Sequence, residues 1–467
     1  MIFVSTKLEI QKMRQIETKQ LPLTSNASQH KHTRRLEVIS DILDSFPHLA
    51  ELARKDLVGT HRTDVGRDGM TGEQVIRVAL LKQMHNLNYR ELAFRLEDSS
   101  VFRRFSRMPY GKPIKHGKLQ SNVKRLSSAT WEAIQKVLVQ YAEENGIETG
   151  RKTRTDCTVV ESNIHEPSDS SLLYDCVRVV IRILFRVSEE VPEASLTFHD
   201  HCKRAKRRAL EIKFPRSKKD KTKHRERSYR DLLKVAGQTY NYGVIALTVL
   251  ANTIAKAPLN SKLQALHIEL GGYLTSMEKV QDQTRRRVLK GEKVPAHEKI
   301  VSIFETHTDI IVKDKRETQF GHKICLTGGA SSMIIDCVIE DGNPADSTLV
   351  ERSIQRQTAL YGRPPRQVSF DGGFASKPNL ELAKSLGVED VVYHKKRGLE
   401  IRDMAKSDRV YKRLKNFRAG IEGCISALKR AFGLDRATWR GLHGFKSYVW
   451  SSVVSFNALV IAKYLIA

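Results

Sequence analysis

Cysteine is scarce in this sequence. No two cysteines form a C-x-x-C pair, and none lies in a Cys/His cluster. This spacing argues against a structural zinc site and against a disulfide framework, and it favours a reducing compartment. The six scattered residues are Cys157, Cys176, Cys202, Cys325, Cys337 and Cys424.

Long uninterrupted hydrophobic runs are also lacking. The N-terminal stretch "MIFVSTKLEIQKMRQ" is too short in its apolar part for a signal peptide. Residues 172–187 carry arginines at four-residue spacing, which is typical of an amphipathic helix. Residues 448–467 contain Asn457 and Lys463, so we interpret them as a buried closing helix. We therefore expect no membrane partner.

Acidic residues are outnumbered, with 53 Asp and Glu against 80 Lys and Arg and a net charge of +27. Such an excess favours polyanionic partners, because a basic surface attracts them over long range and releases their counterions on contact. On charge alone, nucleic acid is the leading partner class and a membrane surface is the second, but we do not expect a membrane as a partner. The length of 467 residues predicts two or three domains.

The N-terminal third has a helical pattern. Residues 1–35 are polar and are predicted to be a flexible arm, and residues 36–150 to be a helical DNA-binding domain. "TGEQVIRVALLKQM" begins with Thr71 as a plausible N-cap, and its apolar positions recur with helical period. A helix, a short turn and a second helix with arginines nearby suit DNA binding. A helical bundle with a solvated basic face explains these residues equally well.

A strand and then a long basic helical region follow. "RTDCTVVES" alternates and is rich in β-branched residues, so it predicts a strand with Asp156 in its middle. Residues 170–299 are predicted to be a helical insertion, in which 203–230 holds 14 Lys and Arg against three acids. Charge runs are often solvated faces, and direct DNA contact is the alternative. The candidate DNA-binding residues here are Lys206, Arg207, Lys218 and Lys219.

Strands return after residue 300. "FGHKICLTG" and "SMIIDCVIED" predict a hairpin, and "RPPRQVSFDGGFAS" predicts a strand that ends at Gly372 and Gly373. If this fourth strand lies parallel to the first, Asp156 and Asp371 face each other across adjacent strands. Residues 151–169 and 300–467 would then form one α/β domain with a mixed sheet.

The last helical segment, "FRAGIEGCISALKRAFGLDRATWRG", carries Arg418, Glu422 and Lys429 at intervals of four and seven, which places them on one helix face. Such a stripe is either an ion pair or part of a phosphate-handling site. Glu422 could join Asp156 and Asp371, and three converging carboxylates would need cations such as Mg²⁺. The acids that compete with Glu422 for the third position are Glu389, Glu400 and Asp435.

These segments resemble the transposases of bacterial insertion sequences in the IS-four/IS-five superfamily. Asp156, Asp371 and Glu422 look like their DDE triad, and "GRDGMTGEQVIRVALLKQMHNLNYRELAFRLEDS" resembles the IS-five-like N-terminal domain. The usual third motif, Y-x2-R-x3-E-x6-K, is matched except that Lys415 replaces Tyr. The resemblance implies an RNase H-like mixed sheet with a large helical insertion, preceded by an all-α N-terminal domain.

The resemblance also implies a function. The enzyme would cut transposon ends and join the 3′-hydroxyl to target DNA, with Asp156, Asp371 and Glu422 holding two Mg²⁺ ions or, alternatively, Mn²⁺. Arg418 and Lys429 would hold DNA phosphates, and Arg440 would grip a DNA end beside Trp439, unless Trp439 is a core residue. The implied partners are double-stranded DNA and further copies of the chain, in the bacterial cytoplasm at the nucleoid. The competing hypothesis is a catalytically silent DNA-binding protein.

Overall fold

The computed structural model describes residues 30–59, 69–109, 113–215, 221–312 and 317–467. Most of the expected N-terminal arm, residues 1–29, lies outside the described residues, as do Lys218 and Lys219. Residues 31–35, which we expected to belong to the arm, form the first turns of helix α1 (Lys31–Asp44) instead.

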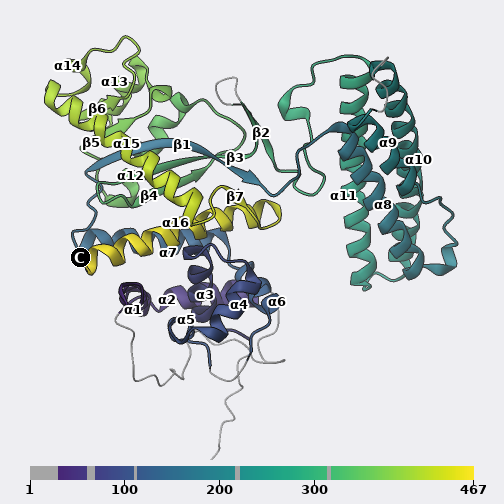
Figure 1. The fold of residues 1–467 in the computed structure, drawn as a ribbon, viewed down its shortest axis with the longest axis horizontal. Helices are drawn as coiled ribbons and strands as arrows, with labels where there is room; N and C mark the ends of the chain where they lie inside the picture. The colour runs from purple at the N-terminus through teal and green to yellow at the C-terminus, as the bar shows by residue number, and fades with distance from the viewer. Residues whose placement is uncertain (1–29, 60–68, 110–112, 216–220, 313–316) are drawn as a thin grey trace, which may run out of the picture. The chain divides into compact units, whose positions relative to one another are not determined.

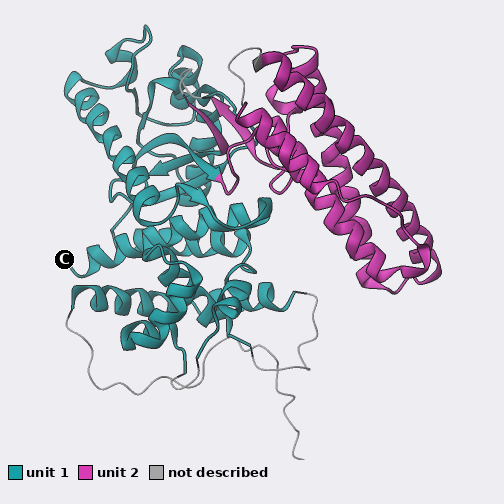
Figure 2. Cartoon of the chain, turned by 45° about the vertical axis from the view of Figure 1, so that its right-hand side comes forward, with its two compact units in different colours: residues 1–161, 322–467 teal, residues 162–321 magenta. Residues whose placement is uncertain are grey.

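The chain divides into two compact units (Figure 2). The first unit comprises residues 1–161 and 322–467, and the second comprises residues 162–321. The helices of the first unit are α1, α2 (His48–Val58), α3 (Gly72–Met84), α4 (Tyr89–Asp98), α5 (Ser100–Ser106), α6 (His116–Val123), α7 (Ser128–Glu144), α12 (Val350–Tyr361), α13 (Lys377–Ser385), α14 (Ile401–Met404), α15 (Asp408–Ala431) and α16 (Gly441–Leu465).

Local sequence signals set the ends of the N-terminal helices. The Thr71 hydroxyl accepts a hydrogen bond from the Gln74 amide, and the Gln74 side-chain oxygen accepts one from the Thr71 amide. This capping box satisfies two amides that the first turn of α3 would otherwise leave without partners, and it confirms Thr71 as the N-cap. Asn88 and Glu91 form the same arrangement at the start of α4.

The strands belong to one mixed sheet with the order β2-β3-β1-β5-β6, in which β4 pairs with β3 and β7 with β1. The first and fifth strands run parallel, with Thr155 opposite Phe370, as the sequence predicted. The predicted hairpin is also present, because β3 and β4 run antiparallel. The strands are β1 (Lys152–Ser162), β2 (Asp309–Val312), β3 (Thr318–Gly328), β4 (Ile334–Ile339), β5 (Gln367–Phe370), β6 (Asp390–Tyr393) and β7 (Arg436–Ala437).

Side chains alternate between the two faces of β1, as the pleat of a strand requires. Arg154 and Asp156 contact residues of α15 on one face. On the opposite face, the Thr155 hydroxyl lies within hydrogen-bonding distance of Ser353 on α12. The helices α15 and α12 therefore cover different faces of the sheet at β1 (Figure 1).

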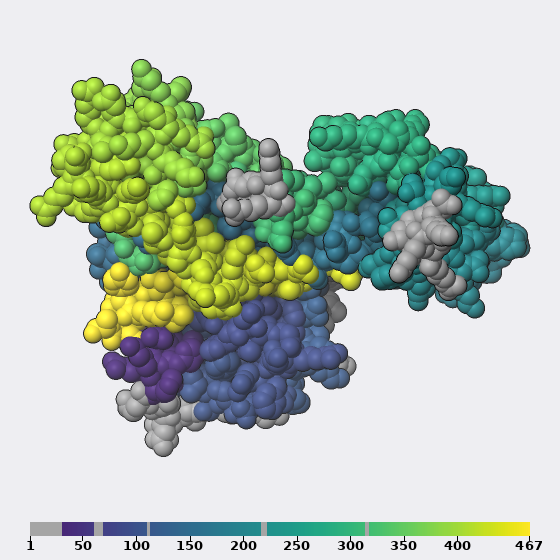
Figure 3. Space-filling view, turned by 45° about the horizontal axis from the view of Figure 1, so that its top comes forward, coloured from purple at the N-terminus to yellow at the C-terminus, as the bar shows by residue number. Residues whose placement is uncertain are grey.

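The C-terminal helix α16 joins the sheet to the N-terminal helices. It packs against α1, α3 and α7 on one side and against β4 on the other, and Figures 1 and 3 show it beside the N-terminal helices. The Asn457 side chain makes two hydrogen bonds to the backbone of Ile334. By length and composition α16 could cross a membrane, but most of its residues are buried in this core, as we expected.

Four helices make up most of the second unit: α8 (Asp169–Glu190), α9 (Cys202–Lys213), α10 (Lys221–Lys256) and α11 (Ser261–Thr284). Leucine, isoleucine and valine side chains from all four helices share one core. Ser168 caps α8 through a capping box with Ser171. A π-helical turn, Arg285–Leu289, ends α11, and Arg287 in this turn pairs with Asp169.

Candidate active site

Two neighbouring strand segments bring Asp156 and Asp371 together. In the parallel register of β1 and β5, Thr155 lies opposite Phe370. Asp156 and Asp371 are the residues that directly follow this pair. Asp156 is 9% exposed, and its Oδ1 accepts a hydrogen bond of 2.8 Å from the Cys157 amide. The Asp371 side chain is 36% exposed.

Helix α15 is fixed over β1 by a buried arginine. Arg154 Nη1 donates to the Phe417 carbonyl at 2.9 Å, and Nη2 donates to Ser332 Oγ at 3.1 Å. The guanidinium lies so close to Gly420 that a Cβ there would be 1.8 Å from Nη1. Because Gly420 has no side chain, the helix backbone can approach β1 closely at this position.

The side chain of Arg418 stands between the three candidate acids. Its Nη2 lies 2.8 Å from Asp156 Oδ2 and 3.3 Å from Asp371 Oδ1, and its Nη1 lies 2.5 Å from Glu422 Oε1. The Arg418 side chain is 9% exposed, whereas that of Glu422 is 58% exposed. The three acids therefore converge on one buried guanidinium, although they come from sequence positions 156, 371 and 422.

Of the two interpretations of the α15 stripe, the structure shows the ion pair. Arg418 and Glu422 do form an i,i+4 ion pair. A surface pair of this kind contributes only a few tenths of a kcal/mol, but Arg418 is buried and also contacts two aspartates. Lys429 lies farther along the helix, with its Nζ 3.7 Å from Asp435 Oδ1.

Further cations lie beside this cluster. Burial lowers the pKa of the Arg154 guanidinium from its ordinary value. Burial, followed by repulsion from Arg413 and Arg154, also lowers the pKa of the Lys152 ammonium. The Lys152 Nζ lies 4.0 Å from the centroid of the Phe417 ring, which gives it a cation–π contact.

The three acids offer oxygen ligands for divalent ions. Carboxylate oxygens are the donors that Mg²⁺ prefers, and three carboxylates against one guanidinium leave a formal charge of −2 at the cluster. Within the described residues, no three Asp, Glu, His or Cys side chains stand close enough together to hold an ion. The chemistry of the three acids fits divalent ions, and Arg418 lies at the point where the acids meet.

The turn after Asp371 is packed tightly. A Cβ at Gly372 would lie 2.9 Å from the Lys395 side chain, and one at Gly373 would lie 2.6 Å from Asp346 Oδ2. Asp346 is also 2.5 Å from the buried Lys323 Nζ. The two glycines therefore let a lysine and an ion pair approach the backbone beside Asp371.

Most of the other candidate DNA-binding residues are exposed. Arg440 is exposed at the N-cap position of α16, whereas Trp439 is buried against Tyr448 and is a core residue. Lys206 and Arg207 are exposed on α9 in the second unit.

The acids that competed with Glu422 pair elsewhere. Glu389 contacts Arg366, Glu400 contacts Arg402, and Asp435 contacts Lys429. Glu422, rather than these acids, contacts the Arg418 guanidinium that also contacts Asp156 and Asp371.

Sequence reasoning missed Arg154 and Lys395. Arg154 precedes Asp156 by two residues and so shares its strand face, which is a signal that the sequence did contain. Lys395 follows β6, and its place beside Gly372 depends on the order of strands in the sheet.

Comparisons with protein families identify two transposase domains in the chain. Residues 301–458 match the Transposase DDE domain, and residues 24–125 match the Transposase domain (DUF772). A search of curated proteins and a search of solved structures each found no match. The DDE domain implies an RNase H-like fold, which agrees with the mixed sheet, and its family normally uses divalent metal ions. With an N-terminal and a catalytic transposase domain in one chain, this protein belongs to the DDE transposases of insertion sequences.

Proposed function

We propose that the protein cuts the ends of its insertion sequence and joins them to target DNA, with Asp156, Asp371 and Glu422 as the ligands of two Mg²⁺ ions. The observation that carries this proposal is the convergence of these three carboxylates on Arg418. Bound ions would activate the attacking oxygen and stabilise the leaving oxygen of each phosphoryl transfer. Mn²⁺ would serve as an alternative ion.

The reaction consists of two displacements at phosphorus. Water first attacks the phosphodiester at the element's end, breaks the bond to the 3′-oxygen and leaves a 3′-hydroxyl and a 5′-phosphate. The 3′-hydroxyl then attacks a phosphodiester of the target, forming a new bond to phosphorus and releasing a target 3′-hydroxyl. The site has to hold both DNA strands in line with these bonds.

Residues of this chain hold the site in shape. Arg154 fixes α15 over β1, and Glu422 on this helix shares the Arg418 guanidinium with the two aspartates. Arg418 balances the carboxylates in the free chain, and it has to release them when ions and DNA phosphates enter, because one guanidinium cannot serve both. Lys429 and Arg440 would contact the DNA backbone near the scissile bond, Lys as a point charge and Arg as a fork.

The basic second unit and a protein partner complete the proposal. Lys206 and Arg207 on α9 would contact the DNA backbone outside the catalytic site. Two element ends have to be held together before joining, so the protein would act as a homodimer or a larger assembly on DNA. It would act in the bacterial cytoplasm, at the nucleoid.

Cleavage and joining test the proposal directly. The substrate is a labelled duplex with the sequence that flanks the coding region, incubated with the full chain and Mg²⁺ or Mn²⁺. We expect wild-type protein to cut and join, and Asp371→Asn and Glu422→Gln to lose both reactions by at least about a thousandfold. Glu400→Gln is the matched control, because Glu400 pairs with Arg402 outside the cluster.

Two results would reject the assignment. Normal cleavage by Asp371→Asn would remove this residue from the reaction. A wild-type chain that binds the ends without cutting them would support the catalytically silent DNA-binding protein.

A further inference from the structure

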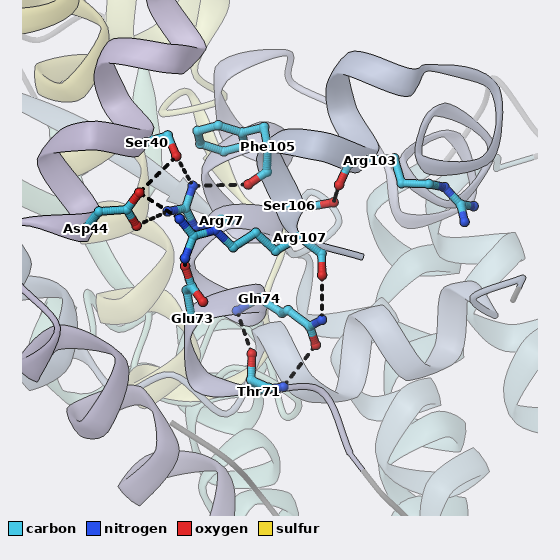
Figure 4. A network of polar contacts seen from close by, with 10 residues as sticks. All are labelled: Ser40, Asp44, Thr71, Glu73, Gln74, Arg77, Arg103, Phe105, Ser106 and Arg107. Carbon is cyan, nitrogen blue, oxygen red and sulfur yellow. Dashed lines mark hydrogen bonds and ion pairs between the residues drawn. The ribbon is translucent and has the colours of Figure 1, made fainter. Parts of the chain in front are cut away.

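The N-terminal helical region of the first unit has arginines that look available for DNA but are used inside the fold. Figure 4 shows Arg77 and Arg107 meeting Asp44 and Glu73 in one network. Arg103 donates to the backbone carbonyls of Leu96 and Pro109. These arginines hold α1, α3, α4 and α5 together, so the surface that meets DNA has to lie elsewhere in this region.

Helix α6 presents such a surface. Its buried residues are Leu119, Asn122 and Val123, and this side packs against α3 and α4. The opposite side is exposed to solvent, with the residues Lys115, His116, Gly117, Lys118 and Ser121.

The charge of this surface has a single sign. Residues 115–125 contain four Lys and Arg and no acid. The neighbouring helix α4 exposes arginines too, but together with three acids, Glu91, Glu97 and Asp98. DNA phosphates would therefore be attracted to α6 without the repulsion that the acids of α4 would add.

Gly117 provides an independent observation. It lies in the first turn of α6, its φ is not positive, and a Cβ placed there would meet nothing within 4 Å. A glycine in a helix costs up to about 1 kcal/mol relative to alanine, and the surrounding fold offers no steric reason for it. A missing side chain on an exposed basic face is what a closely approaching partner backbone requires.

The dimensions also fit a duplex. An α-helix with its side chains is about 10–12 Å in diameter, and the major groove of B-form DNA is about 12 Å wide and admits an α-helix. Lysines would lie at the groove edge near phosphates, while Ser121 lies one turn after Lys118, where a hydroxyl could reach base edges.

We propose that α6 is the helix that enters the major groove of the insertion-sequence ends, with Lys115 and Lys118 on phosphates, Gly117 allowing close approach and Ser121 facing the bases. This assignment rests on the proposed function, since it takes the element's ends as the ligand. It adds the surface that selects those ends, apart from the carboxylates that would cut them.

Binding by the full chain tests the assignment. Fluorescence anisotropy would compare a duplex of the sequence flanking the coding region with a scrambled duplex of equal length and composition, at several salt concentrations. We expect Lys118→Glu to weaken binding to the end duplex about tenfold or more and to reduce the salt slope by about 0.9. Ser121→Ala should reduce the preference for the end over the scrambled duplex.

Lys55→Glu is the matched control, because Lys55 is exposed on α2 of the same region and the change alters net charge equally. It should bind within about twofold of wild type. Gly117→Ala distinguishes an effect on DNA binding from an effect on folding stability. It should raise the thermal midpoint slightly while weakening binding to the end duplex. Stronger or unchanged end binding by Gly117→Ala would contradict close approach.

The outcomes separate this assignment from the catalytic one. Equal weakening by Lys118→Glu and Lys55→Glu would mean that net charge alone matters and would overturn the role of α6, as would a wild-type chain without preference for the end duplex. Cleavage of the ends with normal binding by Lys118→Glu would reject α6 and leave the catalytic proposal intact. Selective binding through α6 without cleavage would support the role of α6 and reject the catalytic proposal.

Discussion

Replacing Gly420 by alanine should destabilise the first unit, although alanine is the better helix former. The new Cβ would lie 1.8 Å from Nη1 and 2.4 Å from Cζ of Arg154. The guanidinium would have to leave, breaking its hydrogen bonds to the Phe417 carbonyl and to Ser332. Each lost bond of a buried group costs roughly 1–3 kcal/mol, and alanine returns about 1 kcal/mol of helix propensity, so we expect a net loss of about 3 kcal/mol.

Gly423 in the same helix is the matched control. A Cβ at Gly423 would meet nothing within 4 Å, so Gly423→Ala should stabilise the helix by roughly 0.5–1 kcal/mol. Tryptophan fluorescence in a urea titration follows the first unit alone, because the three tryptophans, Trp131, Trp439 and Trp450, all belong to it. Equal shifts of the urea midpoint in both variants would refute the role given to Arg154.

Three further changes test other parts of the first unit. Arg418→Gln removes the cation between the three carboxylates, so added Mg²⁺ should raise its thermal midpoint more than that of wild type; equal gains would contradict this. Burial lowers the pKa of Lys82 to about 8, below its ordinary 10.5, so the unfolded chain keeps a proton that the folded chain releases. Stability of the unit should therefore rise from pH 8 to 10.5 in wild type but not in Lys82→Met, and parallel pH profiles would exclude this effect. Gly373→Ala would place a Cβ 2.6 Å from Asp346 Oδ2 and should slow strand cleavage about tenfold at unchanged end binding; a loss of binding instead would assign this turn to DNA recognition.

Much of the sheet was predictable because its signals are local or topological. The β-branched alternation around Asp156 and the abrupt end at Gly372 located two strands, and the helical crossover between later strands required a parallel return. The short strand β2 (Asp309–Val312) was not recognised, because four residues give too little alternation to distinguish a strand from a loop.

The sequence indicated that Asp156, Asp371 and Glu422 would approach one another. It did not indicate that the Arg418 guanidinium contacts all three. The spacing of Arg418 and Glu422 placed both on one helix face, and a DNA-phosphate role was expected for Arg418. Its burial between three carboxylates depends on how deeply α15 docks, which Arg154 and Gly420 determine. Contacts between residues 154 and 420 leave no periodic pattern in the sequence.

Helix α16 has a consequence for synthesis of the protein. It follows the N-terminal helices and β4 in the sequence, and both pack against it. Since α16 is synthesised after them, their apolar sides stay uncovered until it has left the ribosome. A chain interrupted before α16 would expose these apolar sides to solvent, where chaperones and proteases would recognise them.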